Sequence, residues 1–369
     1  MKLIRDLAIR EPDGGFGGEV VVNGSVCYDF VVSLRALFNA RIFTRTKRWG
    51  ATQLPRLPEP LLPKAKFFFQ GFDTSLGYGA ARIVDRLPAE ASPGDLIEAV
   101  AKMPPTELAM FMLDTGETSQ DRLEAYRSVL AGDTSRLAAA VKGLPPGWAT
   151  RCRQVLRHPE TARSDLVDVF GAHLSQIYSH HLDAVADRIA ASVPLARKML
   201  EVLPATAAIE RMTGGYTLGA DLALRKVTLA PSVFIHPFMS ARVDEQSGEA
   251  LIIYGVPSDI FDSYDPVPVR RDLIAALKAM SDPSRLTLLE ILGARPAYAT
   301  ELVTQLGLTQ PTVHHHLAQL RTAGLIRQQR DRHGMKYSIR DDSAAEVLRS
   351  LTELLGTSTE HETTREDQP

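Results

Sequence analysis

Residues 271–340 carry helix start and stop signals in close succession, and they constrain the fold more than any other part of the chain. Ser281-Asp282-Pro283 places a polar cap before a proline, which is a strong helix start signal, and Thr309 with Pro311 repeats the pattern. After Gly324, two alternating runs of residues flank a turn that contains Gly334, as in a β-hairpin. The segment is therefore predicted to form helices over 273–280, 283–293, 299–306 and from 310 onward, then a hairpin with strands over 325–330 and 335–340.

The net charge of the whole chain, −2, hides a strong local asymmetry. Residues 270–340 contain eleven Lys or Arg and five Asp or Glu, a net charge of +6. Residues 341–369 contain two basic and eight acidic residues, a net charge of −6. A basic segment beside an acidic tail suggests a surface that binds a polyanion.

The predicted helix that begins at Gln310 has an apolar and a polar face. At about 100° per residue, three apolar side chains share one stripe. They are Val313, Leu317 and Leu320. His314 and His315 fall away from this stripe, whereas His316 lies beside it and is predicted to pack in the core. Neighbouring side chains on a helix point in different directions, so the three histidines are not expected to share a metal.

A helix–turn–helix followed by a hairpin is the order of elements in a winged helix–turn–helix. Residues 276–286 resemble the leading segment of ArsR-type winged-helix transcriptional regulators, and residues 310–317 and 320–326 resemble their recognition helix and its exit. The hairpin with Gly334 and Tyr337 fits the same family. The resemblance implies a DNA-binding transcriptional regulator that acts as a homodimer on double-stranded operator DNA.

In such a domain the polar face of the recognition helix and the hairpin contact DNA. The major groove accommodates a helix and displays a distinct pattern of base edges, which Gln and His side chains can read. Cations on the hairpin suit phosphates or the minor groove. For Arg321 an internal ion pair is the alternative. The predicted DNA-binding residues are Thr309, Gln310, Thr312, His314, His315, Arg321, Arg330, Arg332, His333 and Lys336.

Metal-sensing members of this family place cysteines on the helix before the turn, or Asp and His on the last helix. The corresponding residues 298–302 contain no cysteine, and the predicted last helix, 343–355, contains no histidine. We therefore predict neither a metal nor a cofactor. One other constellation exists: His173, His180 and Asp187 recur every seven residues on a helix predicted over 161–191. A polar helix face is the favoured interpretation of these three residues, and a metal site is the alternative.

Residues 1–265 mix helix and strand signals. Strands are predicted over 19–22, 226–229, 233–243 and 250–254, with Pro237 marking an edge strand or a break. Prolines divide 95–213 into several helices, and the proline-rich stretch 55–63 is predicted to be a loop or extended. The expected fold class is α+β and mostly helical. It comprises an N-terminal helical domain with a small antiparallel sheet over 1–265, a winged helix over 268–356 and a disordered acidic tail over 357–369.

Two cysteines outside any CxxC pattern, no signal peptide and no long apolar run predict a reduced, cytoplasmic protein with no membrane segment. The N-terminal region is larger than a dimerisation arm needs, so we expect it to bind a small-molecule effector or to oligomerise. Two alternatives stay open. One is an enzyme or ligand-binding protein whose winged helix only targets or dimerises it, and the other is a winged helix that binds proteins. No nucleophile or phosphate-loop motif is present, so the chain is predicted not to be an enzyme.

Overall fold

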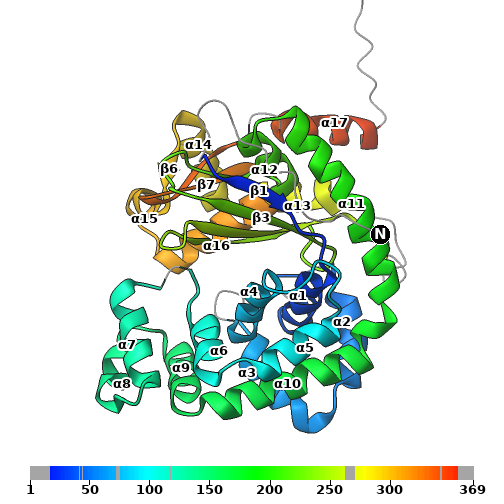
Figure 1. The fold of residues 1–369 in the computed structure, drawn as a ribbon. Coiled ribbons are helices and arrows are strands. Elements are labelled where there is room, and N and C mark those ends of the chain that lie inside the picture. The colour runs from blue at the N-terminus through cyan, green and yellow to red at the C-terminus, as the bar shows by residue number, and fades with distance from the viewer. Residues whose placement is uncertain are drawn as a thin grey trace, which may run out of the picture. The chain divides into compact units, whose positions relative to one another are not determined.

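The computed structural model describes residues 17–40, 42–43, 45–71, 75–116, 118–261, 271–340 and 343–355 (Figure 1). The internal contacts divide the chain into two units. Unit 1 comprises Met1–Ala208 and Leu222–Val267, and unit 2 comprises Ile209–Asp221 and Pro268–Pro369. The segment Ile209–Asp221, which the sequence analysis placed in the N-terminal domain, thus packs with the C-terminal part of the chain. The acidic tail expected over 357–369 lies outside the described residues.

Unit 1 contains a four-stranded sheet of order β1-β3-β5-β4. Its strands are β1 (Glu19–Val22), β3 (Lys226–Ser232), β4 (Met239–Asp244) and β5 (Glu249–Gly255). The expectation of an antiparallel sheet was wrong, because β1, β3 and β5 run parallel and only β4 pairs antiparallel to β5. Figure 1 shows the blue strand β1 beside the green strand β3, two segments far apart in sequence. Every residue of β3 after the first is buried, as is typical of a parallel strand covered on both faces.

The strand predicted over 233–243 is interrupted. The chain leaves β3 after Ser232 and enters β4 only at Met239, and Pro237 lies between the two strands. A break at this proline was one of the two predicted outcomes, and β4 also lies at the edge of the sheet, where a missing ladder hydrogen bond is tolerated. The strand expected over 250–254 is confirmed as β5.

Helices make up most of unit 1 and surround one hydrophobic core. The α-helices are α1 (Val26–Phe38), α2 (Lys47–Gln53), α3 (Leu62–Phe69), α4 (Ala81–Val84), α5 (Pro93–Lys102), α6 (Pro105–Leu113), α7 (Gln120–Leu130), α8 (Leu137–Ala140), α9 (Pro146–Arg157), α10 (Pro159–Gln176) and α11 (Leu182–Val202). The 3-10 turns among the described residues of unit 1 are η1 (Leu54–Arg56), η2 (Glu59–Leu61), η3 (Leu76–Ala80), η4 (Thr134–Arg136) and η5 (Tyr178–His180). None of the helices built from described residues is long and apolar enough to cross a bilayer.

Two local expectations fail in unit 1, and both concern helix boundaries. The stretch 55–63 is not a plain loop, because η1, η2 and the start of α3 each place a proline in a first turn, where its missing N–H costs nothing. The helix predicted over 161–191 is two helices, α10 and α11, separated at Ile177–His181. The Tyr178 hydroxyl there donates hydrogen bonds to Asp29 and to the Val26 carbonyl. A tertiary requirement therefore ends the helix where the local sequence contains no breaker.

Unit 2 is a winged helix–turn–helix. Its elements are α13 (Arg271–Met280), α14 (Pro283–Ala294), β6 (Ala297–Tyr298), α15 (Ala299–Leu306), α16 (Gln310–Thr322), β7 (Ile326–Asp331), β8 (Gly334–Ile339) and α17 (Ser343–Leu355). The helices and the hairpin lie where the sequence predicts them. The sheet is larger than expected, with the order β2-β7-β8-β6. Strand β2 (Tyr216–Leu218), which the sequence analysis missed, follows α12 (Ala205–Thr213) and belongs to the segment Ile209–Asp221.

Candidate nucleic-acid interface

The turn between α15 and α16 is built from residues whose local chemistry favours it. Gly307 ends α15 with a left-handed φ of 62°, a conformation that glycine adopts without the Cβ penalty. Thr309 then caps α16, and its hydroxyl accepts a hydrogen bond from the Thr312 N–H at 3.4 Å. The Thr309 and Thr312 hydroxyl oxygens lie 2.7 Å apart. These two threonines are therefore engaged in starting the helix.

Helix α16 separates its side chains into an inner and an outer face. The inner face is fully buried in the unit 2 core and consists of Val313, Leu317 and Leu320. Gln310, His314 and His315 are exposed, and Thr312 is half-buried. The apolar stripe that the sequence predicts is therefore confirmed, and the residues opposite it present hydrogen-bonding groups to the outside.

His316 occupies the boundary between these two faces. Its side chain is 12% exposed, and its Nδ1 lies 3.9 Å from Oδ1 of Asp282. Asp282 is the N-cap of α14 and accepts the Arg285 N–H at 3.1 Å. Burial lowers the pKa of His316, and the nearby Asp282 carboxylate offsets part of that shift. His316 therefore packs toward the start of α14, as the sequence predicts, while its two neighbours face outward.

The hairpin of β7 and β8 forms the wing, and the Asp331 carboxylate helps to hold its turn. Asp331 accepts hydrogen bonds from the Tyr298 hydroxyl at 2.7 Å and from the His333 N–H at 2.8 Å. The Lys336 ammonium lies 5.7 Å from the centroid of the Tyr298 ring. Arg332 and His333 are exposed at the tip. Sequence reasoning missed Tyr298 and Asp331, which anchor the tip but offer no charge pattern of their own.

The two remaining predicted arginines differ in their surroundings. Arg330 lies on β7 and is half-buried. Arg321 lies at the end of α16, where burial lowers the pKa of its guanidinium and Tyr337 and Tyr216 are its electrostatic neighbours. Both tyrosines belong to the inner face of the wing sheet and are buried. These surroundings favour a supporting role for Arg321 between helix and sheet.

The three residues of the histidine constellation in unit 1 do not share one helix. His173, His180 and Asp187 lie on α10, η5 and α11, because the predicted single helix is broken between them. His173 is buried, with its Nε2 2.7 Å from the Ser33 hydroxyl. Within the described ranges, no three His, Cys, Asp or Glu side chains come together as metal binding would require.

Two features of unit 1 bear on the enzyme alternative. Ser33 and His173 form a hydrogen-bonded pair of the kind that nucleophilic catalysis uses, but both side chains are fully buried and packed beside Phe30. Burial raises the pKa of Cys27 to about 11 and that of Cys152 to about 12. A thiol held in its protonated form is a poor nucleophile. These groups therefore stabilise the core of unit 1.

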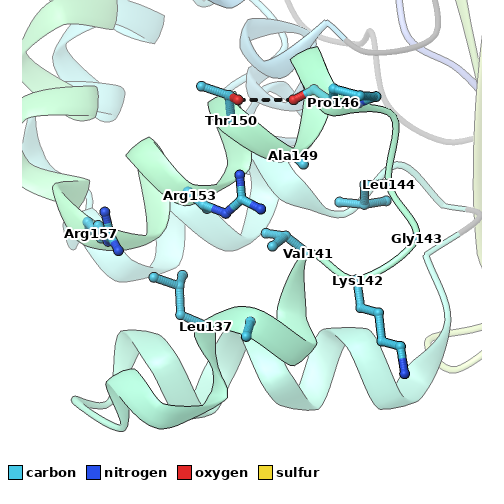
Figure 2. A pocket seen from close by; sticks show the side chains of 11 residues that line it. Leu137, Val141, Lys142, Gly143, Leu144, Pro146, Ala149, Thr150, Arg153 and Arg157 are labelled. Carbon is cyan, nitrogen blue, oxygen red and sulfur yellow. Dashed lines mark hydrogen bonds between the residues drawn. The ribbon is translucent and has the colours of Figure 1, made fainter.

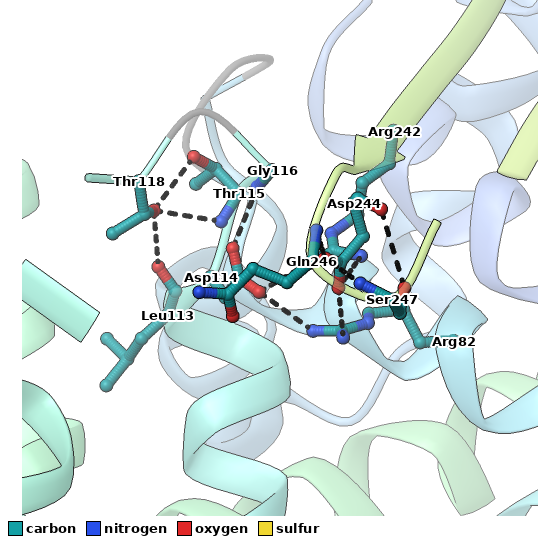
Figure 3. A network of polar contacts seen from close by, with 10 residues as sticks. All are labelled: Arg82, Leu113, Asp114, Thr115, Gly116, Thr118, Arg242, Asp244, Gln246 and Ser247. Carbon is teal, nitrogen blue, oxygen red and sulfur yellow. Dashed lines mark hydrogen bonds and ion pairs between the residues drawn. The ribbon is translucent and has the colours of Figure 1, made fainter. Parts of the chain in front are cut away.

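Four charged side chains form a closed network at one edge of the unit 1 sheet (Figure 3). Arg82 Nη1 lies 3.2 Å from Asp114 Oδ2, and Arg242 pairs with the same carboxylate. Both guanidiniums also lie 3.8 Å from Asp244 Oδ2. Burial lowers the pKa of Arg82 to about 10. Two positive and two negative charges balance, so this network joins α4, the residue that ends α6, and β4, and it leaves no excess charge for a ligand.

A hollow of about 560 Å³ lies between α8 and α9 of unit 1 (Figure 2). Its floor is apolar and is formed mainly by Leu137, Val141, Leu144 and Ala149. Its rim carries three cations and no acidic side chain: Lys142, Arg153 and Arg157. Figure 2 shows the Arg153 guanidinium projecting from α9 toward the space above Val141. The combination of an apolar floor with a cationic rim suits an anionic molecule that has an apolar body.

An exposed polar helix mounted on a helix–turn–helix core, with a wing beside it, defines unit 2 as a winged-helix DNA-binding module. The profile of the family described as "Bacterial regulatory protein, arsR family" matches residues 282–328. The chain is similar to the HTH-type transcriptional regulator YgaV of Escherichia coli (strain K12), with 40% identity over 78 residues that cover 21% of this chain and 79% of that protein. It therefore belongs to the ArsR family of bacterial regulatory proteins and is a DNA-binding transcriptional regulator.

Two further comparisons also cover about a quarter of this chain and most of the similar protein. The uncharacterized HTH-type transcriptional regulator MJ1325 of Methanocaldococcus jannaschii is 32% identical over 78 residues, which cover 21% of this chain and 88% of that protein. The crystal structure of NolR from Sinorhizobium fredii is 27% identical and covers 28% of this chain and 98% of that chain, with a TM-score of 0.20. The match of the family profile to residues 282–328 places the family relationship in the C-terminal part of the chain.

Proposed function

We propose that this chain binds operator DNA as a homodimer, with α16 in the major groove and the wing on the flanking backbone. The exposed face of α16 carries the proposal: Gln310, His314 and His315 point outward while the opposite face is buried. Amide and imidazole groups can bond base edges, and Arg332 and Lys336 on the wing suit phosphates. Two copies related by a two-fold axis would read an inverted repeat with half-sites about one helical turn apart.

Selection of bound fragments from genomic DNA, followed by sequencing, tests this proposal. The enriched fragments should share an inverted repeat, and sedimentation should show two chains on one site. If about six phosphates are neutralised, log affinity should fall with log salt at a slope near −5. Equal affinity for every sequence at physiological salt, or a slope near zero, would contradict operator binding. A single chain per site would contradict the dimer.

We further propose that unit 1 adjusts DNA binding in response to a small organic anion with an apolar body. The hollow between α8 and α9 supports this part of the proposal, because its floor is apolar and its rim is cationic. Decanoate and benzoate are suitable probes, and Trp148, the residue before Ala149 on α9, is a built-in fluorescent reporter.

The test of the effector site compares two arginine variants. Arg153→Ala should weaken probe binding about tenfold, because it removes a cation from the rim. Arg163→Ala, which removes an arginine elsewhere in unit 1, is the matched control and should bind the probe as the unaltered chain does. Equal weakening by both variants, or no change in Trp148 fluorescence with either probe, would contradict the proposed effector class.

A further inference from the structure

Strand β2 is an unexpected part of the DNA-reading unit. It comes from the segment Ile209–Asp221, about a hundred residues before the wing, and it pairs in parallel with β7. The register places Tyr216 beside Gln328 and Leu218 beside Arg330. Without β2, the backbone groups on the outer edge of β7 would have no strand partner. The edge is therefore closed by a strand that a minimal winged helix does not contain.

The contacts of β2 are those of an integral strand. The Gln328 N–H donates to the Gly215 carbonyl at 2.7 Å, and the Gly219 N–H donates to the Arg330 carbonyl at 2.7 Å. Tyr216 and Leu218 are each only 1% exposed. The ladder thus joins backbone hydrogen bonds to buried side chains, which is the combination that makes strand addition stable.

Two acidic residues fasten the ends of this segment to the wing. At its start, Glu210 forms an ion pair with Arg327 on β7. At its end, Asp221 Oδ2 accepts the backbone N–H of Arg332 at 2.9 Å. Arg332 lies at the tip of the wing, directly among the residues that we expect to meet DNA. Asp221 therefore holds the tip from outside the winged helix itself.

The chain continues from both ends of this segment into unit 1. Helix α12 begins in unit 1 and ends in unit 2, and Leu222 again belongs to unit 1. Gly214 and Gly215, with φ of 69° and 111°, turn the chain from α12 into β2.

We propose that Ile209–Asp221 positions the wing for DNA, with Asp221 as the positioning residue at its tip. The inference rests on the proposed DNA-binding function. The inference goes beyond that function, because the positioning residue, Asp221, acts by contacting the protein backbone and not the nucleic acid. A positioning role requires an acceptor oxygen at residue 221, whereas a charge effect requires only its negative charge.

Asp221→Ala and Asp221→Asn in the full chain separate these two roles. Asp221→Ala removes the acceptor, so it should lower the affinity for operator DNA about fivefold and speed amide exchange in β7. Asp221→Asn keeps an acceptor oxygen, so it should stay within about twofold of the unaltered chain in both measurements. Glu290→Ala removes an exposed negative charge of α14 and serves as the charge control.

A reversible disulfide lock between β2 and β7 is the control for variants that merely loosen unit 2. Thr217 and Gln329 are register partners, and Cys27 and Cys152 are buried, so Thr217→Cys with Gln329→Cys can be oxidised as a pair. In the Asp221→Ala background, oxidation should restore DNA affinity and β7 protection, and reduction should remove both.

Several outcomes would overturn the inference. One is Asp221→Ala with unchanged affinity and exchange, and another is equal tightening by Asp221→Ala, Asp221→Asn and Glu290→Ala. A lock that fails to restore β7 protection would also overturn it. If the unaltered chain shows no sequence-specific DNA binding, the proposed function fails, and the exchange measurements still decide whether the segment holds the wing.

Discussion

His173 of unit 1 and the histidines His314 and His315 of unit 2 differ in burial and in the role that follows from it. In unit 1, His173 is fully buried, and its Nε2 bonds the Ser33 hydroxyl within an aromatic cluster. In unit 2, His314 and His315 are exposed on α16. The imidazole of His173 is thus enclosed, whereas those of His314 and His315 are accessible. The difference indicates that His173 serves the architecture of unit 1, whereas His314 and His315 are available to a partner, as the proposed function requires.

Asp29 of unit 1 shows the enclosed arrangement most fully. Its Oδ1 accepts the Ser232 hydroxyl, the Val233 N–H at 2.7 Å and the Phe234 N–H at 3.1 Å, and its Oδ2 accepts the Tyr178 hydroxyl at 3.1 Å. Burial raises the pKa of Asp29 to about 6, although these hydrogen bonds oppose the shift. This one carboxylate joins α1, the end of β3 and η5.

The largest expected effect is the loss of this carboxylate. Asp29→Ala leaves three buried donors without this acceptor and leaves the Tyr178 hydroxyl with only the Val26 carbonyl, so it should lower the free energy of unfolding of unit 1 by about 4 kcal/mol. Asp29→Asn keeps an acceptor for the three donors on Oδ1 and should cost about 1 kcal/mol. Trp49 and Trp148, the only tryptophans of the chain, both lie in unit 1, so urea unfolding followed by their fluorescence measures this unit.

The base preference of unit 2 should be the same in both Asp29 variants. If Asp29→Ala were as stable as the unaltered chain, the hydrogen bonds around this carboxylate would not hold unit 1 together. If it changed the preferred operator sequence, the division of labour between the two units would be wrong.

The next effect is the pH dependence of unit 1. Burial lowers the pKa of His173 to about 3, from the ordinary value of 6.5. Below pH 6.5 the unfolded chain binds a proton at this histidine and the folded chain does not, so stability falls as the pH falls. Between pH 6.5 and pH 5 the contribution of His173 to the free energy of unfolding should fall by about 2 kcal/mol. Asp29 acts in the opposite direction, because its raised pKa lets the folded chain bind a proton first.

Comparison with His173→Gln isolates the histidine. Glutamine can keep a hydrogen bond to Ser33 but does not titrate, while the contribution of Asp29 is common to both proteins. The difference in unfolding free energy between the two proteins should therefore shrink by about 1.4 kcal/mol per pH unit as the pH falls through this window. Parallel pH profiles would show that His173 is accessible to protons in the folded state.

The sequence predicts unit 2 far better than unit 1, and the reason is physical. Asp282, Thr309 and Gly307 specify helix ends by hydrogen bonds or backbone conformation within a few residues. The local sequence therefore predicts the bounds of α14, α15 and α16 closely. In unit 1, the break between α10 and α11 follows from the bond between Tyr178 and Asp29, which are far apart in sequence. A long-range bond of this kind leaves no local signal.

The strand pairings of the sheets show the same limit of prediction from local sequence. The parallel pairing of β1 with β3 joins residues about two hundred positions apart, and nothing near Glu19 or Lys226 predicts it. Strand β2 is different, because Tyr216-Thr217-Leu218 alternates between glycines and could have been interpreted as a strand. Its partner, however, was not deducible. The outward residues of α16 were predicted because helical periodicity alone separates them from the core.

A smaller effect should distinguish the three adjacent histidines of α16. His314→Ala or His315→Ala should weaken specific DNA binding by about 1–3 kcal/mol at one operator position and leave the stability of unit 2 unchanged. His316→Ala should instead lower that stability by about 1 kcal/mol, because it removes packing and the proximity to Asp282. Its effect on DNA should be the same for all sequences.

Unit 2 contains no tryptophan, so its stability is best followed by amide exchange in α14 and α16. Fluorescence anisotropy with operator variants, each changed at one base pair, measures base preference. Should His316→Ala alter base preference while exchange stays slow, the orientation of α16 would be wrong. Should His315→Ala destabilise unit 2, the histidine would belong to the core and the contrast with His173 would disappear.

The smallest expected effect is that of metals, for which we predict none. In the stretch where metal-sensing relatives place cysteines, Glu301 accepts the Tyr298 N–H at 3.2 Å and pairs with Arg295 at 3.2 Å, and the Tyr298 hydroxyl donates to Asp331. These oxygens already serve the fold of unit 2. Zinc, cadmium and arsenite at micromolar concentration should therefore leave operator affinity within about twofold of that of chelator-treated protein.

A loss of operator affinity of about tenfold on addition of any of these metals would show that a metal site exists. If that loss vanished in His314→Ala or His315→Ala, the metal would be competing with DNA for the outward face of α16. If it vanished instead in His180→Ala or Asp187→Ala, unit 1 would hold an open ligand set, and the contrast between enclosed and presented side chains would no longer separate the two units.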